Sequence, residues 1–294
     1  MTAIAAAPIA NAGAIAEADA WCRTYARAHD ENFTVMSWFL PREMRLHLAA
    51  LYAFCRWTDD LGDEAEGDRS QLLDDWEREL RDCFDTRRNE PLFIALGRTV
   101  DACAIPIEPF LRLIEANRMD QRISAYDTYD DLLRYCELSA APVGSMVLHA
   151  LGYHDEQRHT LAAATCIALQ LANFWQDVSV DLAKGRIYIP AADMRASGYS
   201  EADLRAGVVN GAFRDVMRSE VARARELLAQ GRALEPLIDR RARTDIRLFR
   251  LGGQAVLDAI ERANYDVLSR RPRASKMKKA RMALTNGLRI KLGL

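Results

Sequence analysis

The sequence has little glycine and proline, and its cysteines form no motif. Fifteen glycines and nine prolines in 294 residues are too few for an all-β protein, which needs a turn roughly every eight to twelve residues. The six cysteines are scattered without a Cys-x-x-Cys pair, which is typical of reduced thiols rather than of a disulfide framework. We therefore expect a helical, cytoplasmic protein.

A membrane-spanning run and a strong net charge are also missing. No apolar stretch reaches the roughly 18 residues that a transmembrane helix needs. The net charge of −2 argues against a protein that coats nucleic acid, so we expect no nucleic-acid partner. The apolar N-terminus has no basic residue before Arg23 and is interrupted at Pro8, unlike a secretory signal. We expect residues 1–20 to form a flexible, alanine-rich leader.

From Trp21 onward, apolar residues recur at helical spacing. The clearest expected helices are 45–57, 71–84, 107–119, 161–180 and 216–229. Alternating strand patterns, internal repeats and long linkers are lacking, so the pattern predicts one all-α domain over residues 21–282. A basic tail follows at 283–294. The last 25 residues contain nine Lys or Arg and no acid, which fits either a solvated end or peripheral contact with the inner face of an anionic membrane.

A narrow polar stripe marks the segment 46–64. From Leu46 to Thr58 the only strongly polar side chains are His47 and Arg56, so this helix should be buried. At roughly 100° per residue, one arc of roughly 60° holds four polar side chains. These four residues, here called the first acidic stripe, are Tyr52, Arg56, Asp59 and Asp63. Asp60 lies beside them.

The segment 161–190 repeats this arrangement. Thr160 is the expected N-cap, and Gly185 with Pro190 should end the helix. Four polar side chains lie within an arc of roughly 80° on an otherwise apolar helix. These residues, here called the second acidic stripe, are Gln170, Asn173, Asp177 and Asp181.

Each stripe has two interpretations. It is either the wet face of a surface helix or part of a binding site. Like charges at i,i+4 destabilise a helix unless something neutralises them, and buried unpaired charge is costly. The stripes are also too narrow for ordinary surface helices. We therefore expect the two carboxylate pairs to face each other across an apolar cavity, binding Mg²⁺ together with substrate phosphate. An apolar wall with a polar rim suits a hydrocarbon substrate with a phosphate head.

The residues around both stripes resemble a known family. The runs YAFCRWTDDLGDE (52–64) and QLANFWQDVSVDLAKGRIYIP (170–190) resemble the squalene/phytoene synthases, as do RMDQRISAYDTYDDLLRYCELSAAPVG (118–144) and YDVLSRRPRASKMKK (265–279). The resemblance implies an isoprenoid-synthase helical bundle around a central apolar cavity, with Mg²⁺ as cofactor and a prenyl diphosphate as substrate.

The resemblance also implies roles for particular residues. The implied metal ligands are Asp59, Asp63, Asn173, Asp177 and Asp181. Residues expected to bind the substrate are Arg56, Asp60, Gln170, Asn173 and Arg186. Tyr52 and Tyr188 are expected to orient the reacting water, so that they and the four stripe aspartates form the catalytic set.

Departures from the commoner family pattern narrow the prediction. Gln176 replaces an arginine and Val180 a glutamate of the usual NILRDVGED run, and Gly253 stands where some members have a tyrosine. These departures resemble the hydroxysqualene synthases of the bacterial hopanoid route. That subfamily converts presqualene diphosphate and water to hydroxysqualene and diphosphate, a carbon–oxygen lyase reaction. A separate presqualene diphosphate synthase and a flavin-dependent reductase are its pathway neighbours.

Three alternatives stay open. The first is head-to-head condensation of two prenyl diphosphates to presqualene diphosphate, dehydrosqualene or phytoene. The second is a non-catalytic family member that acts as a scaffold, which should have lost the metal aspartates. The third is an unrelated helical lipid-binding module, whose ligand affinity should not depend on Mg²⁺. No dinucleotide-binding GxGxxG occurs in a strand–helix setting, in agreement with an enzyme that performs no reduction.

Overall fold

A computed structural model describes residues 12–29, 40–85 and 88–273. Within these ranges the regular structure is helical, and the one β-type pairing is an isolated parallel bridge between Ala125 and Ile187. The prediction of an all-α protein is confirmed. None of the described helices is long and apolar enough to cross a membrane.

The chain forms two compact units, residues 1–121 with 145–155 and residues 122–144 with 156–294. Unit 1 contains α1 (Ala12–His29), α3 (Arg42–Asp63), α4 (Arg69–Phe84), α5 (Pro91–Cys103) and α6 (Glu108–Asp120). Unit 2 contains α7 (Tyr129–Ser139), α9 (Glu156–Ala183), α10 (Ala191–Ala196), α11 (Glu201–Arg205), α12 (Gly211–Gly231), the 3₁₀ turn η1 (Arg232–Leu237) and α13 (Arg240–Arg262). Helix α8 (Ala141–Ala150) contains the boundary between them.

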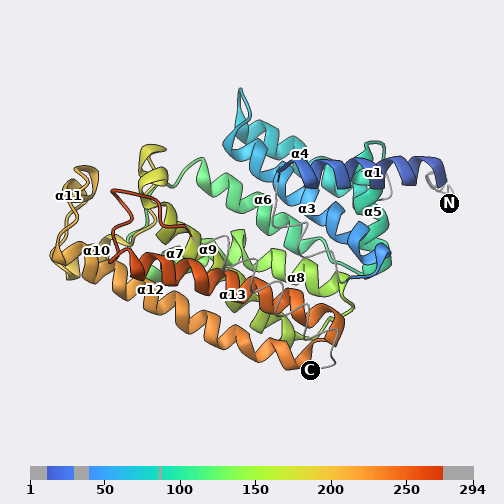
Figure 1. Cartoon of the computed structure of the whole chain (residues 1–294). Coiled ribbons are helices and arrows are strands. Elements are labelled where there is room, and N and C mark those ends of the chain that lie inside the picture. Colours follow the sequence, from blue (N-terminus) through green and yellow to red (C-terminus); the bar gives the residue numbers. More distant parts are fainter. Residues whose placement is uncertain (1–11, 30–39, 86–87, 274–294) are drawn as a thin grey trace. The chain divides into compact units, whose positions relative to one another are not determined.

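Helix α3 is the centre of unit 1, where α1, α4, α5 and α6 all pack against it (Figure 1). Its apolar surface explains this position, since Phe54 is fully buried and stacks on Trp76 of α4 at a ring-centroid distance of 5.4 Å. The rings of Phe54 and of Phe110 on α6 meet edge to face, at a centroid distance of 5.1 Å. Trp76 Nε1 donates a hydrogen bond of 2.9 Å to Thr58 Oγ1, which satisfies both buried polar groups.

The N-terminal segment differs from the expected leader. Helix α1 already begins at Ala12, and Ala18 and Asp19 are buried. The Asp19 carboxylate pairs with Arg98 of α5 at 2.6 Å. Residues 12–20 are therefore tied into unit 1 by burial and an ion pair. Residues 1–11 and the basic tail at 283–294 lie outside the described residues.

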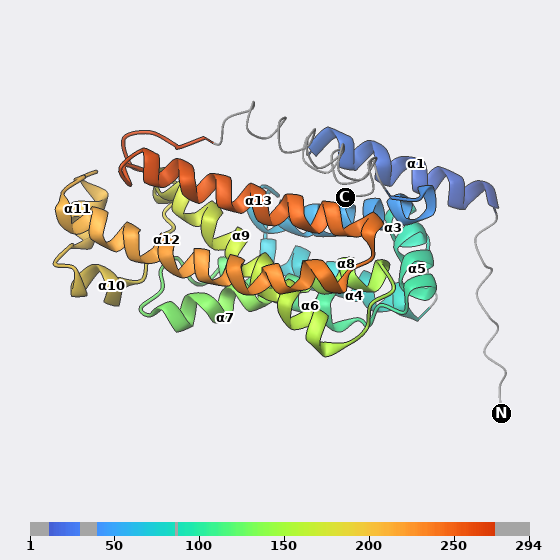
Figure 2. The same cartoon turned by 60° about the horizontal axis from the view of Figure 1, so that its bottom comes forward.

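Helix α9 is the long element of unit 2, and α12 and α13 pack along it (Figure 2). It begins at Glu156, so the predicted N-cap at Thr160 is wrong. Residues 156–160 continue the helix, and Glu156 in the first turn interacts favourably with the helix dipole. The predicted end is confirmed, because α9 stops at Ala183 and Gly185 adopts φ +80°, which glycine tolerates without strain.

Candidate active site

The first acidic stripe lies on α3, a continuous helix from Arg42 to Asp63, so the predicted helical spacing holds. Burial raises the pKa of Asp59 to about 7, and the long contact from Asn117 and the positive charge of Arg56 oppose this rise. The charges of Asp63 and Asp60 raise the same pKa further. Asn117 Nδ2 of α6 stands 3.4 Å from Asp59 Oδ1. The Asp59 carboxylate is therefore dehydrated and close to like charges, and Asn117 and Arg56 compensate its burial only in part.

Asp60 has strong partners of its own. Arg56, one turn earlier, places Nη2 2.5 Å from Asp60 Oδ1, and Tyr25 Oη of α1 donates a hydrogen bond of 2.6 Å to Oδ2. Burial and the contact with Asp60 raise the pKa of Tyr25, so that the hydroxyl remains a donor. Arg56 also reaches Glu64 at 3.2 Å. Both oxygens of Asp60 are thus engaged by the protein, and its predicted role in binding substrate stays a prediction.

Tight packing between α6 and the end of α3 supports this stripe. A Cβ atom at Gly62 would stand 2.3 Å from Asn117 Oδ1, so only glycine allows α6 to come this close. Gln121 Nε2 donates to the carbonyl oxygens of Gly62 at 2.9 Å and of Asn117 at 3.0 Å. Asn117 Nδ2 also donates to the carbonyl oxygen of Leu113 at 3.1 Å, which helps to hold the side-chain amide beside Asp59.

The second acidic stripe lies on α9. Gln170, Asp177 and Asp181 are half-buried, and Asn173 is exposed. The Asp177 carboxylate forms a two-point ion pair with Arg271, which follows α13. Nη2 stands 2.8 Å from Oδ2, and Nε contacts Oδ1. The buried Gln176 donates from Nε2 to the carbonyl oxygen of Pro272 at 2.6 Å.

A pocket in unit 2 brings together Asp181, Arg186 and Tyr188, three of the predicted site residues. Its apolar wall includes Phe174, whose ring stacks on that of Tyr188 at a centroid distance of 3.7 Å and an interplanar angle of 9°. The segment that carries Arg186 and Tyr188 is held by a backbone hydrogen bond of 2.7 Å from Ile187 N to the carbonyl oxygen of Ser124. The pocket therefore has the polar rim and apolar wall that the sequence predicts.

The donor chemistry of the stripes fits Mg²⁺. Each stripe offers two carboxylates, and the second adds the side chain of Asn173, which are the hard oxygen ligands that Mg²⁺ prefers together with substrate phosphates. The raised pKa of Asp59 indicates a buried carboxylate that lacks a sufficient counter-charge, as expected for a position that receives a cation. Among the described residues, no group of three or more His, Cys, Asp or Glu gathers to hold a metal unaided. That the two stripes face each other stays a prediction.

Three supporting residues escape sequence reasoning. Tyr25 and Arg271 are far from the stripes in sequence, and no periodicity connects them. Two of them had a signal in the family resemblance: Asn117 directly precedes the RMD block, and Arg271 lies within the run 265–279. All three contact stripe aspartates or their neighbour Asp60.

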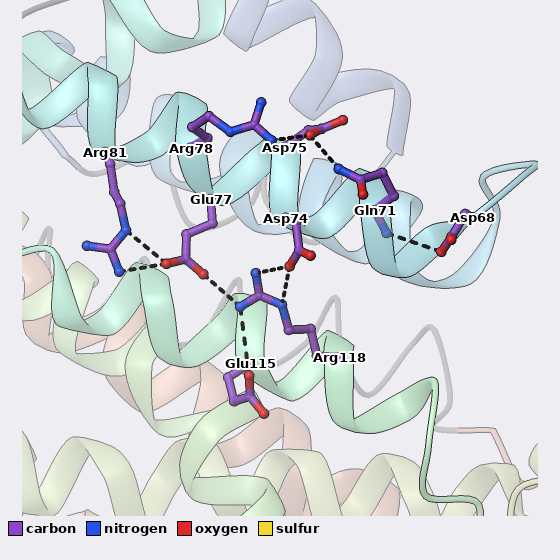
Figure 3. A network of polar contacts seen from close by, with 9 residues as sticks. All are labelled: Asp68, Gln71, Asp74, Asp75, Glu77, Arg78, Arg81, Glu115 and Arg118. Atoms are coloured by element: carbon purple, nitrogen blue, oxygen red, sulfur yellow. Dashed lines mark hydrogen bonds and ion pairs between the residues drawn. The ribbon is translucent and has the colours of Figure 1, made fainter.

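Acidic residues on α4 provide a contrast to the stripes (Figure 3). Arg118 of α6 lies between Asp74 and Glu77 at 2.6 Å and 2.7 Å, and a further contact reaches Glu115 at 3.8 Å. Glu77 also pairs with Arg81 at 2.6 Å. Acids and arginines alternate here and neutralise one another, so this cluster stabilises the packing of α4 on α6 and shows no feature of a metal site.

The helical fold and the two aspartate-bearing helices define an isoprenoid synthase of the all-α class. The family model described as squalene/phytoene synthase matches residues 26–278, and the chain belongs to this family. Membership places it among the enzymes of isoprenoid biosynthesis that act on prenyl diphosphates.

Two phytoene synthases are similar to this chain over most of its length. The chain is 34% identical over 266 residues to phytoene synthase 3 of Zea mays, covering 88% of this chain and 62% of the maize protein. It is 34% identical over 272 residues to a phytoene synthase of Arthrospira platensis, covering 85% and 86% of the two chains.

Solved structures agree with this fold. Squalene synthase HpnC from Alicyclobacillus acidocaldarius matches with 46% identity and a TM-score of 0.84, over 90% of this chain and 99% of that one. A dehydrosqualene synthase in complex with ligand matches with a TM-score of 0.86 over 94% and 98% of the two chains. At 24% identity, this second match shows the fold alone.

Proposed function

We propose that this protein is a Mg²⁺-dependent hydroxysqualene synthase, which converts presqualene diphosphate and water to hydroxysqualene and diphosphate. The carbon–oxygen bond to diphosphate breaks with its electron pair leaving on the diphosphate. Water forms the new carbon–oxygen bond, and one proton is released. The proposed chemistry needs one enzyme that supplies presqualene diphosphate and another that reduces the product.

The observation that carries this proposal is the environment of Gln176. The commoner family pattern has an arginine there, whereas this chain has a neutral amide that is 9% exposed and donates to the carbonyl oxygen of Pro272. A buried amide bound to backbone cannot supply the positive charge that an arginine would bring to a diphosphate. The 46% identity to squalene synthase HpnC, against 31–34% to the phytoene synthases, supports the squalene branch of the family, to which the proposed reaction belongs.

In the proposed reaction the protein positions and neutralises the diphosphate. We propose that the metal ligands are Asp59, Asp63, Asn173, Asp177 and Asp181. When bound, Mg²⁺ would act as a Lewis acid that stabilises the charge on the departing diphosphate. Arg56 and Arg186 add fixed positive charge for the phosphate oxygens, and Gln170 and Asp60 help to position the substrate. Tyr52 and Tyr188 orient the water. The stacked rings of Phe174 and Tyr188 keep the adjoining wall apolar.

Condensation of two prenyl diphosphates is the second candidate, because relatives at 31–34% identity are phytoene synthases. The packing at Gly253 bears on it. A Cβ atom there would stand 2.6 Å from Leu169 Cδ2 of α9, so the tyrosine that some family members carry at this position would require at least the Leu169 side chain to shift. This chain therefore departs at two packed positions, 176 and 253, from residues that the commoner family pattern or some family members carry there.

A product assay distinguishes the two candidates. Purified full-length protein is incubated with Mg²⁺ and either presqualene diphosphate or farnesyl diphosphate, without NADPH. We expect hydroxysqualene from presqualene diphosphate and no C30 product from farnesyl diphosphate. Formation of a C30 product from farnesyl diphosphate would establish the condensing activity instead. A folded protein inactive with both substrates would favour the scaffold alternative.

A further inference from the structure

We propose that Arg271 is an internal counter-ion for Asp177 that occupies this carboxylate until a cation and a diphosphate bind together, and that Gln176 is the residue that positions it. The inference rests on the proposed role of Asp177 as a metal ligand. It adds a coupling between the metal and the diphosphate to the proposed function.

The ion pair engages both oxygens of the Asp177 carboxylate. Arg271 directs Nε to Oδ1 and Nη2 to Oδ2 of Asp177, the bidentate arrangement that makes arginine–carboxylate contacts strong and directional. The two residues are 94 positions apart in sequence, so the contact is tertiary. A cation that coordinates the same oxygens of Asp177 therefore competes with the guanidinium.

The backbone around Arg271 is anchored while its side chain is not. Pro272 is buried, and its carbonyl oxygen accepts the 2.6 Å hydrogen bond from Gln176 Nε2. Earlier in the segment, Val267 is fully buried and Ser269 N bonds to Asp266 Oδ1 at 2.9 Å. The Arg271 side chain, in contrast, is 46% exposed. It can leave Asp177 by side-chain rotation without movement of the segment.

Before a cation binds, the ion pair between Arg271 and Asp177 reduces charge repulsion on α9. Asp177 and Asp181 are one turn apart on the same helix, and like charges at this spacing destabilise it. Arg271 offsets that repulsion. Because Gln176 and Asp177 are adjacent and hold Pro272 and Arg271 respectively, the amide sets the register of the ion pair.

Release of Arg271 links two ligands. When a cation takes the Asp177 oxygens, the guanidinium loses its anion, and a diphosphate supplies a new one. The cation therefore binds better when diphosphate is present, and diphosphate binds better when the cation is present, by the same factor. A cation alone has to break the ion pair without this compensation and binds more weakly.

The test measures Mn²⁺ binding, as a spectroscopic substitute for Mg²⁺, to full-length protein with and without inorganic pyrophosphate. The wild type is compared with Arg271→Gln, and Arg273→Gln is the matched control because it removes the same charge from an exposed position of the same segment. We expect Arg271→Gln to bind Mn²⁺ alone about five-fold more tightly than Arg273→Gln, the size of a partly exposed ion pair. The enhancement by pyrophosphate should shrink by a similar factor.

A second variant addresses the positioning role. Gln176→Met keeps the side-chain volume but cannot donate to the carbonyl oxygen of Pro272. It should therefore change the Mn²⁺ affinity and its enhancement by pyrophosphate in the same direction as Arg271→Gln, by a smaller factor. Thermal unfolding checks that each variant is folded.

The outcomes separate this inference from the proposed function. Equal Mn²⁺ affinities of Arg271→Gln and Arg273→Gln, or weaker binding by Arg271→Gln, would overturn the counter-ion role while leaving the metal site intact. Absence of Mn²⁺ binding in every protein, even with pyrophosphate, would overturn the proposed metal site and with it the inference.

Discussion

Each acidic stripe carries a pair of aspartates four residues apart on one helix, yet the protein neutralises the two pairs in different ways. On α3, Arg56 belongs to the stripe itself and pairs with Asp60, while Asp59 is left with a weak contact from Asn117. On α9 the stripe contains no cation, and the counter-charge of Asp177 comes from Arg271, far away in sequence.

This difference shows how a buried acidic pair can be kept ready for a metal. The first stripe tolerates a dehydrated carboxylate, whose pKa of about 7 reflects the cost of burial. The second stripe pairs its carboxylate with a removable side chain, that of Arg271. On the proposed function, the first stripe would gain a metal cation, and the second would exchange the Arg271 guanidinium for one.

The largest effect should come from removing one aspartate of each stripe. Asp59→Asn and Asp177→Asn should each lower turnover by about 10³-fold, because each removes a ligand that acts on the developing charge of the leaving group. Their stabilities should differ. Asp59→Asn removes a poorly compensated buried charge and should raise the unfolding temperature, whereas Asp177→Asn loses the pair with Arg271 and should lower it. Steady-state kinetics and thermal unfolding measure both.

Asp75→Asn is the control for these variants. Asp75 is exposed on α4 and pairs with Arg78 at 2.5 Å, so turnover should stay at the wild-type level. Equal shifts of unfolding temperature for Asp59→Asn and Asp177→Asn would mean that the stripes are neutralised alike.

Asp245 extends the comparison to a carboxylate without any counter-charge. It is 4% exposed on α13, and its oxygens have no hydrogen-bond partner among the described residues. Burial raises its pKa to about 7 from 3.8. Between these two values the native state holds a proton that the unfolded state has lost, so this residue lowers stability as the pH rises through that window.

Asp245→Asn should therefore be more stable than the wild type near pH 8, by about 2–4 kcal/mol at most. Below about pH 3 the Asp245 carboxyl is protonated in both the native and the unfolded state, and the difference should vanish. Urea unfolding at both pH values gives the free energies. A variant less stable than the wild type near pH 8 would show that the carboxylate has a partner that only its charged form can satisfy.

The helices and the stripes could be predicted from the sequence, because both depend on spacing within one helix. The expected helix 45–57 lies inside α3 and the expected helix 161–180 inside α9. The expected helices are shorter than the observed ones because polar residues at helix ends show no apolar periodicity. Thr160 shows this directly, since the polar residues before it form the first turn of α9.

The partners of the stripes could not be predicted in this way. Tyr25, Asn117 and Arg271 reach Asp60, Asp59 and Asp177 across 35, 58 and 94 residues. Which residues meet across such separations depends on how helices pack. Periodicity describes one helix at a time and contains no information about its neighbours.

A substitution at Gly62 tests whether the contact from Asn117 supports Asp59 in the first stripe. Gly62→Ala would place a Cβ atom 2.3 Å from Asn117 Oδ1, which forces Asn117 away from Asp59. We expect the free energy of unfolding to fall by about 1–3 kcal/mol, the usual cost of overpacking. Mn²⁺ binding should weaken as well.

Gly252→Ala is the matched control, because no atom lies within 4 Å of a Cβ there. Alanine inside helix α13 should stabilise the protein slightly. If Gly62→Ala, like the control, does not lower stability and leaves Mn²⁺ binding unchanged, Asn117 does not support Asp59.

Tyr25 tests the strong support of Asp60. Tyr25→Phe removes the 2.6 Å hydrogen bond to this carboxylate and should cost about 1–2 kcal/mol of stability, since the acceptor is charged. Turnover should fall by a few-fold, because Arg56 still holds Asp60. Tyr199→Phe, which loses a 2.9 Å bond to the Val208 carbonyl oxygen in unit 2, should lower stability without lowering turnover.

The smallest effect should come from the acidic cluster on α4, which separates the stripes from acids that merely lie close together (Figure 3). Asp74 is 57% exposed, and Arg118 keeps its contact with Glu77 when Asp74 is removed. Asp74→Asn should change the free energy of unfolding by less than about 1 kcal/mol and leave Mn²⁺ binding unchanged. A loss of Mn²⁺ binding would mean that exposed, arginine-paired acids bind the cation as the stripes do. Burial on an apolar helix would then no longer distinguish a site from a surface.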